Sequence, residues 1–484
     1  MITGWADDRK KTRRRNGAGN GIGTDLNGRR VVVVGLARSG KAAVELLLSR
    51  GARVTATDVR PESELALGPD PWKGRNVRLE LGEHPAGVLH GADLVVVSPG
   101  VPSDSPVVDD AAERGIPVIG ELELAFRLSR GTWLAVTGTN GKTTTTALLG
   151  ALVARAGHPT VVAGNIGVAL SSEVARIPDD GYVVAEVSSF QLDTVVSFRP
   201  RVGVLLNITE DHLDRYESFE AYAASKRRIF ENQVSTDFAV LNVDDRLVGE
   251  IAGTLASTVI PVSTEREVAG GVFVRDGAIV SQFGGRESEV IRVDELGLPG
   301  PHNLANSAAA TAAALAIGVD VGAVAEELRA FRPLPHRMED VCEVDGVRFV
   351  NDSKATNVES VACALGSYRS PIVLIAGGKD KGTDFGRLRE LVERNVRALV
   401  LIGETAGKLE SALSGAAPIE RAASLEEAVR MARQWADPGD VVLLSPACAS
   451  FDMFRDYEDR GDAFREAVRA LSTESGRACE REAK

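Results

Sequence analysis

The sequence predicts an α/β protein of three domains, each built around a mostly parallel sheet. The chain has 484 residues, which at roughly 150 residues per domain gives about three separate cores. From residue 29 onward, apolar runs typical of buried strands alternate with segments of helical spacing. No apolar run approaches the roughly 18 residues that a membrane helix needs. These observations together favour strand-helix repeats over an all-helical or membrane fold.

The first domain is expected at residues 29–120, with a Rossmann-like order of strands and helices. RRVVVVGL is a continuous apolar run, and GKAAVELLLSRG follows with helical spacing and a glycine stop. The expected elements are strands at 29–36, 52–58 and 92–100 and a helix at 40–51.

The second domain is expected at residues 121–333, around strands at 132–138, 181–189, 200–208 and 237–245. GGVFVRDGAIV predicts a hairpin that turns at Asp276 and Gly277. HNLANSAAATAAALAIG predicts a helix of small residues suited to close packing, and the prolines of FRPLPHR favour a linker.

The third domain is expected at residues 334–472. SPIVLIAGG, VRALVLIG and GDVVLLSPA predict buried strands, and SLEEAVRMARQWA predicts an amphipathic helix between them. Residues 1–28 are expected to form a disordered leader, and residues 473–484 a flexible tail.

Charge and cysteine content limit the classes of partner. The net charge of −12 argues against a nucleic-acid or anionic-membrane partner, although nucleic-acid binding by RKKTRRR in the leader is left open. Four widely spaced cysteines form no CxxC pair, which argues against a zinc knuckle and fits a reducing cytoplasm.

The stretch VTGTNGKTT predicts a shortened phosphate loop between a strand and a helix. Gly141, Lys142 and Thr143 supply the end of the GxxxxGK[ST] pattern, but Val136 stands where the outer glycine belongs, so Gly138 becomes the turn residue. Backbone N–H groups of residues 138–143 are expected to point toward a phosphate. Lys142 is expected to bridge the β- and γ-phosphates and Thr143 to hold Mg²⁺. A plain glycine turn is the alternative, and the Lys-Thr pair disfavours it.

A second glycine loop, GLARSG, follows the first expected strand. Ala37 replaces the glycine that lets a backbone approach a pyrophosphate, while Asp58 ends the next strand eighteen residues after Gly40. On the residues alone, a dinucleotide site and a turn without ligand both stay open.

Charged residues at expected strand ends suggest a metal and anion site. Glu186, Asp211 and His212 lie where strands of such a sheet face the ligand crevice, and carboxylates there suit Mg²⁺. Lys226 lies in an expected helix, where an exposed lysine is the simpler interpretation. Three further lysines in loops after strands could hold carboxylates: Lys354, Lys379 and Lys381.

Taken together, these motifs resemble the Mur ligase family over residues 29–472. TGTNGKTT, EVSSFQL, NITEDHLDRY, HNLANSAAA, LPHR and NDSKATN occur in that family's order. Within the family, LLSPACASFDMFRDYEDRG is similar to the members that add D-glutamate.

The resemblance implies an ATP-dependent ligase of cytoplasmic peptidoglycan precursor synthesis, acting as a monomer. Its small-molecule substrates would be UDP-N-acetylmuramoyl-L-alanine and D-glutamate, with ATP and two Mg²⁺ ions and no nucleic-acid or membrane partner. One glycine loop would then serve UDP and the other ATP, and Ala37 would need to fit no dinucleotide.

The resemblance also implies a role for individual residues. The UDP-substrate positions are Ser39, Asp58, Arg60, Gly100 and Asn165. The ATP positions are Thr137, Gly138, Thr139, Asn140, Gly141, Lys142, Thr143, Asn303, Asn306, Arg337 and Asp352. The D-glutamate positions are Thr356, Lys381, Ser450 and Tyr457.

Metal and catalytic roles complete what the resemblance implies. Thr143 and Glu186 would hold one Mg²⁺ and His212 a second, with Lys226 carried as a carbamate beside them. The catalytic set is Lys142, His212, Lys226 and Lys354, the last near the reacting phosphate. Val59 and Tyr457 depart from the threonine and phenylalanine of some relatives.

Three rival functions remain. A folylpolyglutamate-type ligase would share the ATP domain, but the segment SPACASFDMF does not suit that function. An oxidoreductase would bind NAD at GLARSG. A non-enzymatic switch would bind ATP without transferring phosphate.

Overall fold

A computed structural model of the chain describes residues 24–65, 72, 74–85, 87–165, 167–211, 215–298, 300–332, 335–368, 370–380 and 383–474. It contains three sheets of five, nine and six strands, distributed over two compact units. The first unit consists of Met1–Ile208, Glu220–Glu295 and Ala305–Arg329 and holds the five- and nine-stranded sheets. The second unit consists of Thr209–Phe219, Leu296–Leu304 and Ala330–Lys484 and holds the six-stranded sheet.

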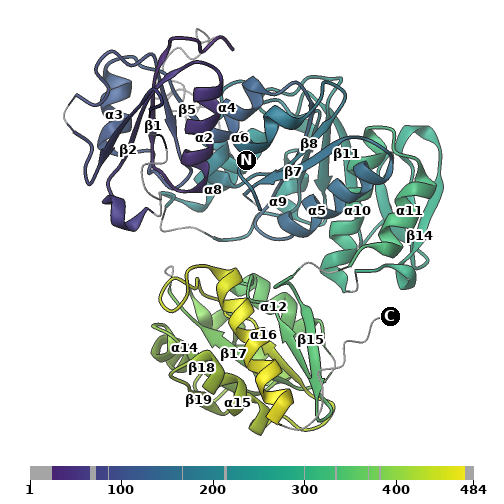
Figure 1. Ribbon diagram of the computed structural model, residues 1–484. Helices are drawn as coiled ribbons and strands as arrows, with labels where there is room; N and C mark the ends of the chain where they lie inside the picture. The colour runs from purple at the N-terminus through teal and green to yellow at the C-terminus, as the bar shows by residue number, and fades with distance from the viewer. Residues whose placement is uncertain are drawn as a thin grey trace. The chain divides into compact units, whose positions relative to one another are not determined.

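The five-stranded sheet is fully parallel, in the order β3-β2-β1-β4-β5. This is the order of a Rossmann-type sheet, in which ligands bind where the strand order reverses, here between β1 and β4. Figure 1 shows α2 and α3 on opposite faces of the sheet. Its elements are β1 (Arg30–Val34), α2 (Arg38–Ser49), β2 (Arg53–Asp58), η2 (Glu62–Glu64), β3 (Val77–Leu81), β4 (Leu94–Val97), α3 (Pro106–Glu113) and β5 (Val118–Gly120).

The nine-stranded sheet has the order β14-β13-β12-β11-β10-β9-β6-β8-β7. Its strands are parallel from β7 to β12, and an antiparallel edge of β12, β13 and β14 completes it. The strands are β6 (Thr132–Thr137), β7 (Thr160–Gly164), β8 (Tyr182–Glu186), β9 (Val202–Leu205), β10 (Phe238–Asn242), β11 (Thr258–Ser263), β12 (Val272–Arg275), β13 (Ala278–Ser281) and β14 (Ser288–Arg292).

The helices that follow the strands of this sheet bring polar residues to the carboxyl ends of the parallel strands. The α-helices are α4 (Glu121–Leu128), α5 (Lys142–Arg155), α6 (Leu170–Glu173), α7 (Ser189–Leu192), α8 (Phe219–Arg227), α9 (Arg246–Glu250), α10 (Pro301–Ala316) and α11 (Val321–Ala330). Short 3-10 turns are η3 (Val174–Arg176), η4 (Arg228–Phe230), η5 (Ala252–Thr254), η6 (Phe283–Gly285) and η7 (Val293–Glu295).

The six-stranded sheet has the order β15-β16-β20-β17-β18-β19 and is parallel except for β15. Its two faces pack two separate apolar clusters, one containing Val361 of α12 and the other Phe464 of α16. The elements are β15 (Glu339–Val344), β16 (Val347–Asn351), α12 (Val358–Gly366), β17 (Ile372–Gly377), η8 (Phe385–Leu388), α13 (Arg389–Asn395), β18 (Val396–Ile402), α14 (Ala406–Leu413), β19 (Ile419–Arg421), α15 (Leu425–Trp435), β20 (Val441–Leu444) and α16 (Tyr457–Glu474).

The fold class expected from the sequence is confirmed, since the chain carries three α/β sheets that are mostly parallel. The expected hairpin turns at Asp276 (φ 51°) and Gly277 (φ 72°), the two positive φ angles that a tight two-residue turn needs. The boundaries of the three domains stay predictions, as do the leader and the tail, which lie mostly outside the described residues. Within the described part of the chain, no helix is long and apolar enough to cross a membrane.

Candidate active site

The phosphate loop connects β6 to α5, and close packing explains both of its glycines. Gly138 has φ 152° and Gly141 has φ 82°, conformations that side chains rarely adopt. A Cβ at Gly141 would lie 2.3 Å from Asn306 Oδ1, and one at Gly138 would lie 3.0 Å from Leu206 Cβ. Both glycines of the shortened loop are therefore closely packed, Gly138 against Leu206 after β9 and Gly141 against Asn306 of α10.

Asn207, just after β9, fixes the first half of the loop. Its backbone carbonyl accepts a 3.0 Å hydrogen bond from Thr139 N, and its Oδ1 accepts one of 2.8 Å from Asn140 N. Asn207 Nδ2 also donates to Asn140 O at 3.1 Å. The expectation that every backbone N–H of residues 138–143 points toward a phosphate is therefore wrong for Thr139 and Asn140. The backbone N–H groups at the start of α5 therefore remain as the groups of this loop that we expect to bind an anion.

Two lysines converge on one carbonyl of this loop. Lys142 Nζ donates to Gly138 O at 2.9 Å and to Thr139 O at 2.6 Å, while Lys226 Nζ donates to Gly138 O at 2.8 Å. Lys226 is only 2% exposed, and its ammonium lies 4.5 Å from the centre of the Tyr222 ring. An exposed-lysine interpretation of Lys226 is therefore wrong. The two side chains bring positive charge to the place where a phosphate would bind.

Glu186 provides a buried carboxylate beside the phosphate loop. It ends β8, pairs in register with Val136 of β6, and is 1% exposed. Its Oε1 accepts a 2.7 Å hydrogen bond from Asn165 Nδ2, whereas its Oε2 has no hydrogen-bond partner among the described residues. A buried carboxylate oxygen without a partner is costly, and a cation would satisfy it. Glu186, with the buried Thr143 at the start of α5, therefore fits a Mg²⁺ site.

Asn306 of α10 lies against the same loop. Its Oδ1 accepts a 3.2 Å hydrogen bond from Thr145 Oγ1, which fixes α10 against the first turns of α5. Thr137, at the end of β6, is fully buried, and within the described part of the chain its hydroxyl has no hydrogen-bond partner. The expected nucleotide residues of the first unit thus gather at the carboxyl end of β6.

Asp58 organises the glycine loop of the five-stranded sheet. It accepts hydrogen bonds from Leu36 N at 2.7 Å, from Arg60 N at 2.9 Å, and from the Arg60 guanidinium at 2.9 and 3.0 Å. Burial opposes ionisation of Asp58, but the hydrogen bonds from Arg60 and Leu36 outweigh it and lower the pKa to about 2. The carboxylate is therefore ionised and holds both the loop and Arg60 in place.

The other expected UDP-substrate residues, Ser39, Gly100 and Asn165, are more exposed than Asp58. Ser39 is half-buried in the first turn of α2, and Gly100 is exposed after β4. Val59, which departs from some relatives, is 60% exposed beside Asp58. Asn165 follows β7 of the nine-stranded sheet, and its side chain contacts Glu186. It therefore connects the expected substrate and metal positions.

The segment that carries Asn165 is also bound to the five-stranded sheet's helices. Arg38 of α2 donates to Gly167 O, and Glu121 Oε1 of α4 accepts a 2.6 Å hydrogen bond from Ser171 N. Burial raises the pKa of the Glu121 carboxyl, and the hydrogen bond from Ser171 and the charge of Arg38 oppose that rise. Gly167 before α6 and Ser171 within α6 thus connect this segment to α2 and to α4, respectively.

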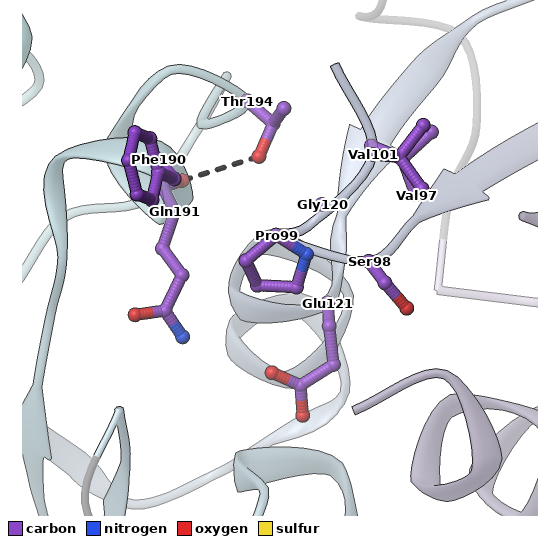
Figure 2. A pocket seen from close by; sticks show the side chains of 9 residues that line it. All are labelled: Val97, Ser98, Pro99, Val101, Gly120, Glu121, Phe190, Gln191 and Thr194. Atoms are coloured by element: carbon purple, nitrogen blue, oxygen red, sulfur yellow. Dashed lines mark hydrogen bonds between the residues drawn. The ribbon is translucent and has the colours of Figure 1, made fainter. Parts of the chain in front are cut away.

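A small cavity marks the junction of the two sheets in the first unit. It encloses about 20 Å³, which is room for about one water. Figure 2 shows Ser98, Gly120 and Glu121 lining it opposite Gln191 and Thr194. A Cβ at Gly120 would lie 2.1 Å from Thr194 Oγ1. The cavity is therefore a packing junction, too small for a substrate.

In the second unit, Asp352 directly follows β16 and interacts electrostatically with Arg337. Asp352 accepts hydrogen bonds from Ser445 Oγ at 3.0 Å and Met338 N at 3.2 Å. Burial raises its pKa to about 7, although Arg337, Ser445 and Met338 oppose the rise. His302 faces Arg337 too, and burial followed by that charge lowers its pKa to about 4. Asn303, the remaining expected ATP residue, is buried one position further along α10.

Lys354 and Tyr457 form a pair in the second unit. Lys354 Nζ donates to the Tyr457 hydroxyl at 3.1 Å and lies 4.7 Å from the ring centre, and that hydroxyl donates to Glu458 Oε1 at 2.8 Å. An expected catalytic residue therefore contacts an expected D-glutamate residue. Ser450 is buried after β20, and Thr356 is half-buried before α12.

Two expected site residues, His212 and Lys381, lie outside the described residues. Asp211 is described, and its Oδ2 accepts a 3.4 Å hydrogen bond from Asn357 Nδ2. Lys379 is exposed, and its backbone pairs with Ala449.

Family models and relatives agree with this geometry. The models described as "Mur ligase MurD-like, N-terminal domain", "Mur ligase middle domain" and "Mur ligase, glutamate ligase domain" match residues 29–120, 136–314 and 336–448. The chain belongs to the Mur ligase family.

Curated relatives cover nearly the whole of this Mur ligase. The UDP-N-acetylmuramoylalanine–D-glutamate ligase of Geobacter metallireducens is 51% identical over 93% of this chain and 99% of its own length. The protein of the same name from Pelotomaculum thermopropionicum is 49% identical over 92% of this chain and 99% of its own.

Solved structures share the Mur ligase fold at low identity. The UDP-N-acetylmuramate-alanine ligase of Thermotoga maritima matches with a TM-score of 0.59 and 19% identity, over 92% of this chain and 99% of its own. The MurF ligase of the same organism, solved in complex with ADP, matches with a TM-score of 0.57 and 17% identity, over 93% and 97%. These likenesses show the fold.

Sequence reasoning missed several residues that shape the Mur ligase site. Asn207 fixes the phosphate loop, and the Tyr222 hydroxyl lies 3.1 Å from Thr139 Oγ1 beneath it. Arg460 of α16 is 1% exposed and donates to Ser353 O at 2.8 Å and Cys448 O at 3.2 Å, which ties β16 to the loop after β20. Asn207 lies near the end of the strand expected at 200–208, so strand-end position could have identified it. Nothing in the pattern around Arg460 indicated a buried guanidinium.

Proposed function

We propose that the chain is an ATP-dependent ligase that joins D-glutamate to UDP-N-acetylmuramoyl-L-alanine through an acyl phosphate, as a step of peptidoglycan precursor synthesis. It would act in the cytoplasm as a monomer. The names and near-complete coverage of the curated relatives support the reaction.

The structural observation that carries the proposal is the arrangement around Glu186. Its unpartnered carboxylate oxygen lies at the end of β8, next to the strand that leads into the phosphate loop. The same region holds two lysines on Gly138 O. A phosphate loop beside a buried cation site is what transfer of the γ-phosphate of ATP requires.

We assign Glu186 and Thr143 to one Mg²⁺ and His212 to a second, with Lys226 beside them as a carbamate. Bound Mg²⁺ would neutralise phosphate charge and polarise the γ-phosphate. In the unmodified form Lys226 donates to Gly138 O, so a carbamate would exchange a positive group for a carboxylate at a buried position.

The first chemical step joins two anions, and the chain's own cations make it possible. The L-alanyl carboxylate attacks the γ-phosphorus of ATP, the bond from this phosphorus to the β–γ bridging oxygen breaks, and ADP leaves. The ammonium of Lys142 would leave the loop carbonyls of Gly138 and Thr139 to bind the transferring phosphate. Ser39, Asp58, Arg60, Gly100 and Asn165 would hold the UDP-substrate, and Asn303, Asn306, Arg337 and Asp352 would complete the ATP site.

The second step forms the amide bond. The D-glutamate amine attacks the acyl carbon, the tetrahedral intermediate collapses, and phosphate leaves. Thr356, Lys381, Ser450 and Tyr457 would form the D-glutamate site, where Lys381 and the Ser450 loop would hold the carboxylates, and Lys354 would lie near the reacting phosphate. Because water would hydrolyse the acyl phosphate, the bound substrates must exclude it.

A phosphate-release assay tests the proposal. The protein receives ATP, Mg²⁺ and UDP-N-acetylmuramoyl-L-alanine, with D-glutamate, L-glutamate, L-lysine or diaminopimelate as the amino acid. We expect phosphate release that depends on the UDP-substrate and on D-glutamate, with the amide product confirmed by mass spectrometry.

The same assay separates the rival functions. Phosphate release without an amino acid would indicate an ATPase, and no release would favour a non-enzymatic ATP switch. A folyl substrate in place of the UDP-substrate tests the folylpolyglutamate-type ligase, and an NADH titration tests the oxidoreductase. Equal rates with D- and L-glutamate would contradict the proposed substrate.

A further inference from the structure

A second charged cavity lies in the five-stranded sheet, at the amino-terminal ends of β1, β2 and β3. This is the opposite edge from the glycine loop that we assign to UDP. The cavity measures about 360 Å³, a volume in the range of small-molecule sites. Its described polar lining residues are Arg30, Arg53, Thr55, Arg75, Asn76, Arg78 and His90.

Strand register places the arginines on one face of the sheet. Arg30 of β1 pairs directly with Arg53 of β2, and Thr55 pairs with Arg78 of β3. Because Arg53 and Thr55 are two residues apart on one strand, all three arginines point to the same side. Like charges directly opposite each other on neighbouring strands destabilise a sheet. An arrangement of this kind is stabilised by an anion between them.

The nearby carboxylates do not supply that anion. Among the described residues that line the cavity there is no aspartate or glutamate, in a chain whose net charge is −12. Two of the neighbouring acids are paired with the outer arginines, Glu45 with Arg75 at 2.8 Å and Glu80 with Arg78.

The third neighbouring acid, Asp93, is also engaged away from the cavity. It accepts a 2.8 Å hydrogen bond from the backbone N of Arg30 and lies 3.7 Å from the Arg29 guanidinium. Among the described residues, no hydrogen-bond or ion-pair partner contacts the guanidinium of Arg30 or of Arg53.

Among the residues that the structure describes, no helix covers this end of the face. The described residues of the connection from β3 to β4 form turns and bends, whereas α3 packs over Val32 and Val34 nearer the carboxyl ends. Val32, Val88 and Ala92 supply an apolar wall below the arginines. The cavity thus combines an apolar wall with a cluster of guanidinium groups.

We propose that this cavity binds a phosphorylated small molecule at a site separate from the ATP and UDP sites. A guanidinium group can donate two parallel hydrogen bonds to two oxygens of one phosphate. Arg30 and Arg53 would therefore bind one phosphate together, and Arg78 would bind a second. A ligand with two phosphates would neutralise the facing charges that the chain leaves uncompensated.

Inorganic pyrophosphate is a suitable probe, measured by isothermal titration calorimetry without Mg²⁺ and at ionic strength matched with NaCl. The titration is carried out in a Lys142→Ala background, which weakens binding at the phosphate loop. In this background we expect one pyrophosphate per chain. Adding Arg30→Gln and Arg53→Gln should weaken that binding at least tenfold.

A matched control removes two charges elsewhere in the same unit. Arg130→Gln with Arg246→Gln replaces two side chains that are each 80% exposed, and pyrophosphate affinity should stay within twofold. The Arg30→Gln and Arg53→Gln variant, made in the parent, should keep its ligase rate and its melting temperature without anion, which shows that it folds.

Three results would overturn the proposal. The first is absence of pyrophosphate binding in the Lys142→Ala background. The second is equal affinity in the Arg30→Gln and Arg53→Gln variant and in the control variant. The third is citrate binding as tight as that of pyrophosphate, because a tricarboxylate of similar charge would then show general anion attraction instead of phosphate recognition.

Discussion

Asn165 binds Glu186 through two hydrogen bonds: its Nδ2 donates to Oε1 at 2.7 Å, and its backbone N–H donates to the Glu186 carbonyl at 2.9 Å. One residue of the UDP-substrate set thereby fixes the orientation of the carboxylate that we assign to Mg²⁺. Since Oε1 is occupied, only Oε2 is available to a cation. Substrate binding at Asn165 and metal binding at Glu186 are therefore expected to depend on each other.

Replacing Asn165 by alanine should weaken both functions. A hydrogen bond to a charged group contributes roughly 1.5–3 kcal/mol, so we expect kcat/KM for the UDP-substrate to fall at least about tenfold. The Mg²⁺ concentration for half-maximal rate should rise as well, because Glu186 loses its orienting donor. Steady-state rates over a matrix of substrate and Mg²⁺ concentrations measure both effects.

Asn232→Ala is the matched control for this prediction. Asn232 Nδ2 donates to the backbone carbonyls of Val196 and Phe198, so its loss removes an amide donor without touching a carboxylate. An Asn165→Ala enzyme with unchanged Mg²⁺ dependence would show that the two residues act independently.

Replacing Glu186 by glutamine should separate chemistry from substrate binding. Glutamine keeps the shape of the side chain but removes the charge that a divalent cation needs. We expect phosphate release to fall at least about a hundredfold, while the dissociation constant of the UDP-substrate, measured calorimetrically without Mg²⁺, changes less than about threefold. Parental activity at saturating Mg²⁺ would be incompatible with a metal role for Glu186.

The buried environment of Lys226 allows its chemical state to be tested by two opposite substitutions. Lys226→Arg keeps a positive charge near Gly138 O, whereas Lys226→Glu supplies a carboxylate in place of the proposed carbamate. We expect the glutamate variant to retain more phosphate-release activity than the arginine variant. Removal of CO₂ from the buffer should lower the activity of the parent and leave the glutamate variant unchanged. The reverse order of the two variants would assign Lys226 a role as an ammonium group.

The sequence predicted the fold well because buried parallel strands have a strong local pattern. RRVVVVGL and SPIVLIAGG became β1 and β17, and the Asp276-Gly277 turn became a hairpin. VRLEL, which forms β3, was not anticipated, because this edge strand has no fully buried residue and no apolar run.

Residues of the site could be predicted from the sequence only where they belong to a recognisable motif or lie at the end of an expected strand. The phosphate loop and Glu186 were found at strand ends, but the burial of Lys226 was not, because it follows from the packing of α8 against the loop. Contacts between distant segments, such as Asn207 with the phosphate loop, depend on strand order, which no local pattern records.

Tyr457→Phe tests the pair formed with Lys354. The substitution removes the hydroxyl that accepts from Lys354 Nζ at 3.1 Å but keeps the ring 4.7 Å from the ammonium. A net hydrogen bond contributes roughly 0.5–1.5 kcal/mol, so we expect kcat to fall about two- to tenfold. The KM for D-glutamate should change less than twofold if the hydroxyl acts through Lys354. A large KM effect with unchanged kcat would place the hydroxyl on the amino acid itself.

Asp352 should make the stability of the second unit depend on pH. Its pKa is raised from 3.8 to about 7, mainly by burial, so between these values the folded chain keeps a proton that the unfolded chain has lost. Stability therefore decreases as pH rises through this window, by up to about 1.4 kcal/mol for each pH unit. Asp352→Asn cannot titrate, so its melting temperature relative to the parent should rise from pH 5 to pH 7 and level off above, as measured by scanning calorimetry.

Ser445→Ala provides a second test of the same carboxyl. Ser445 Oγ donates to Asp352 Oδ2 and favours the ionised form, so its removal should raise the pKa of Asp352 further. The stability of the Ser445→Ala chain, measured relative to Asp352→Asn, should therefore keep decreasing up to a higher pH than the stability of the parent does. A pH-independent difference between Asp352→Asn and the parent would mean that Asp352 ionises at its ordinary pKa, and that Arg337 compensates its burial fully.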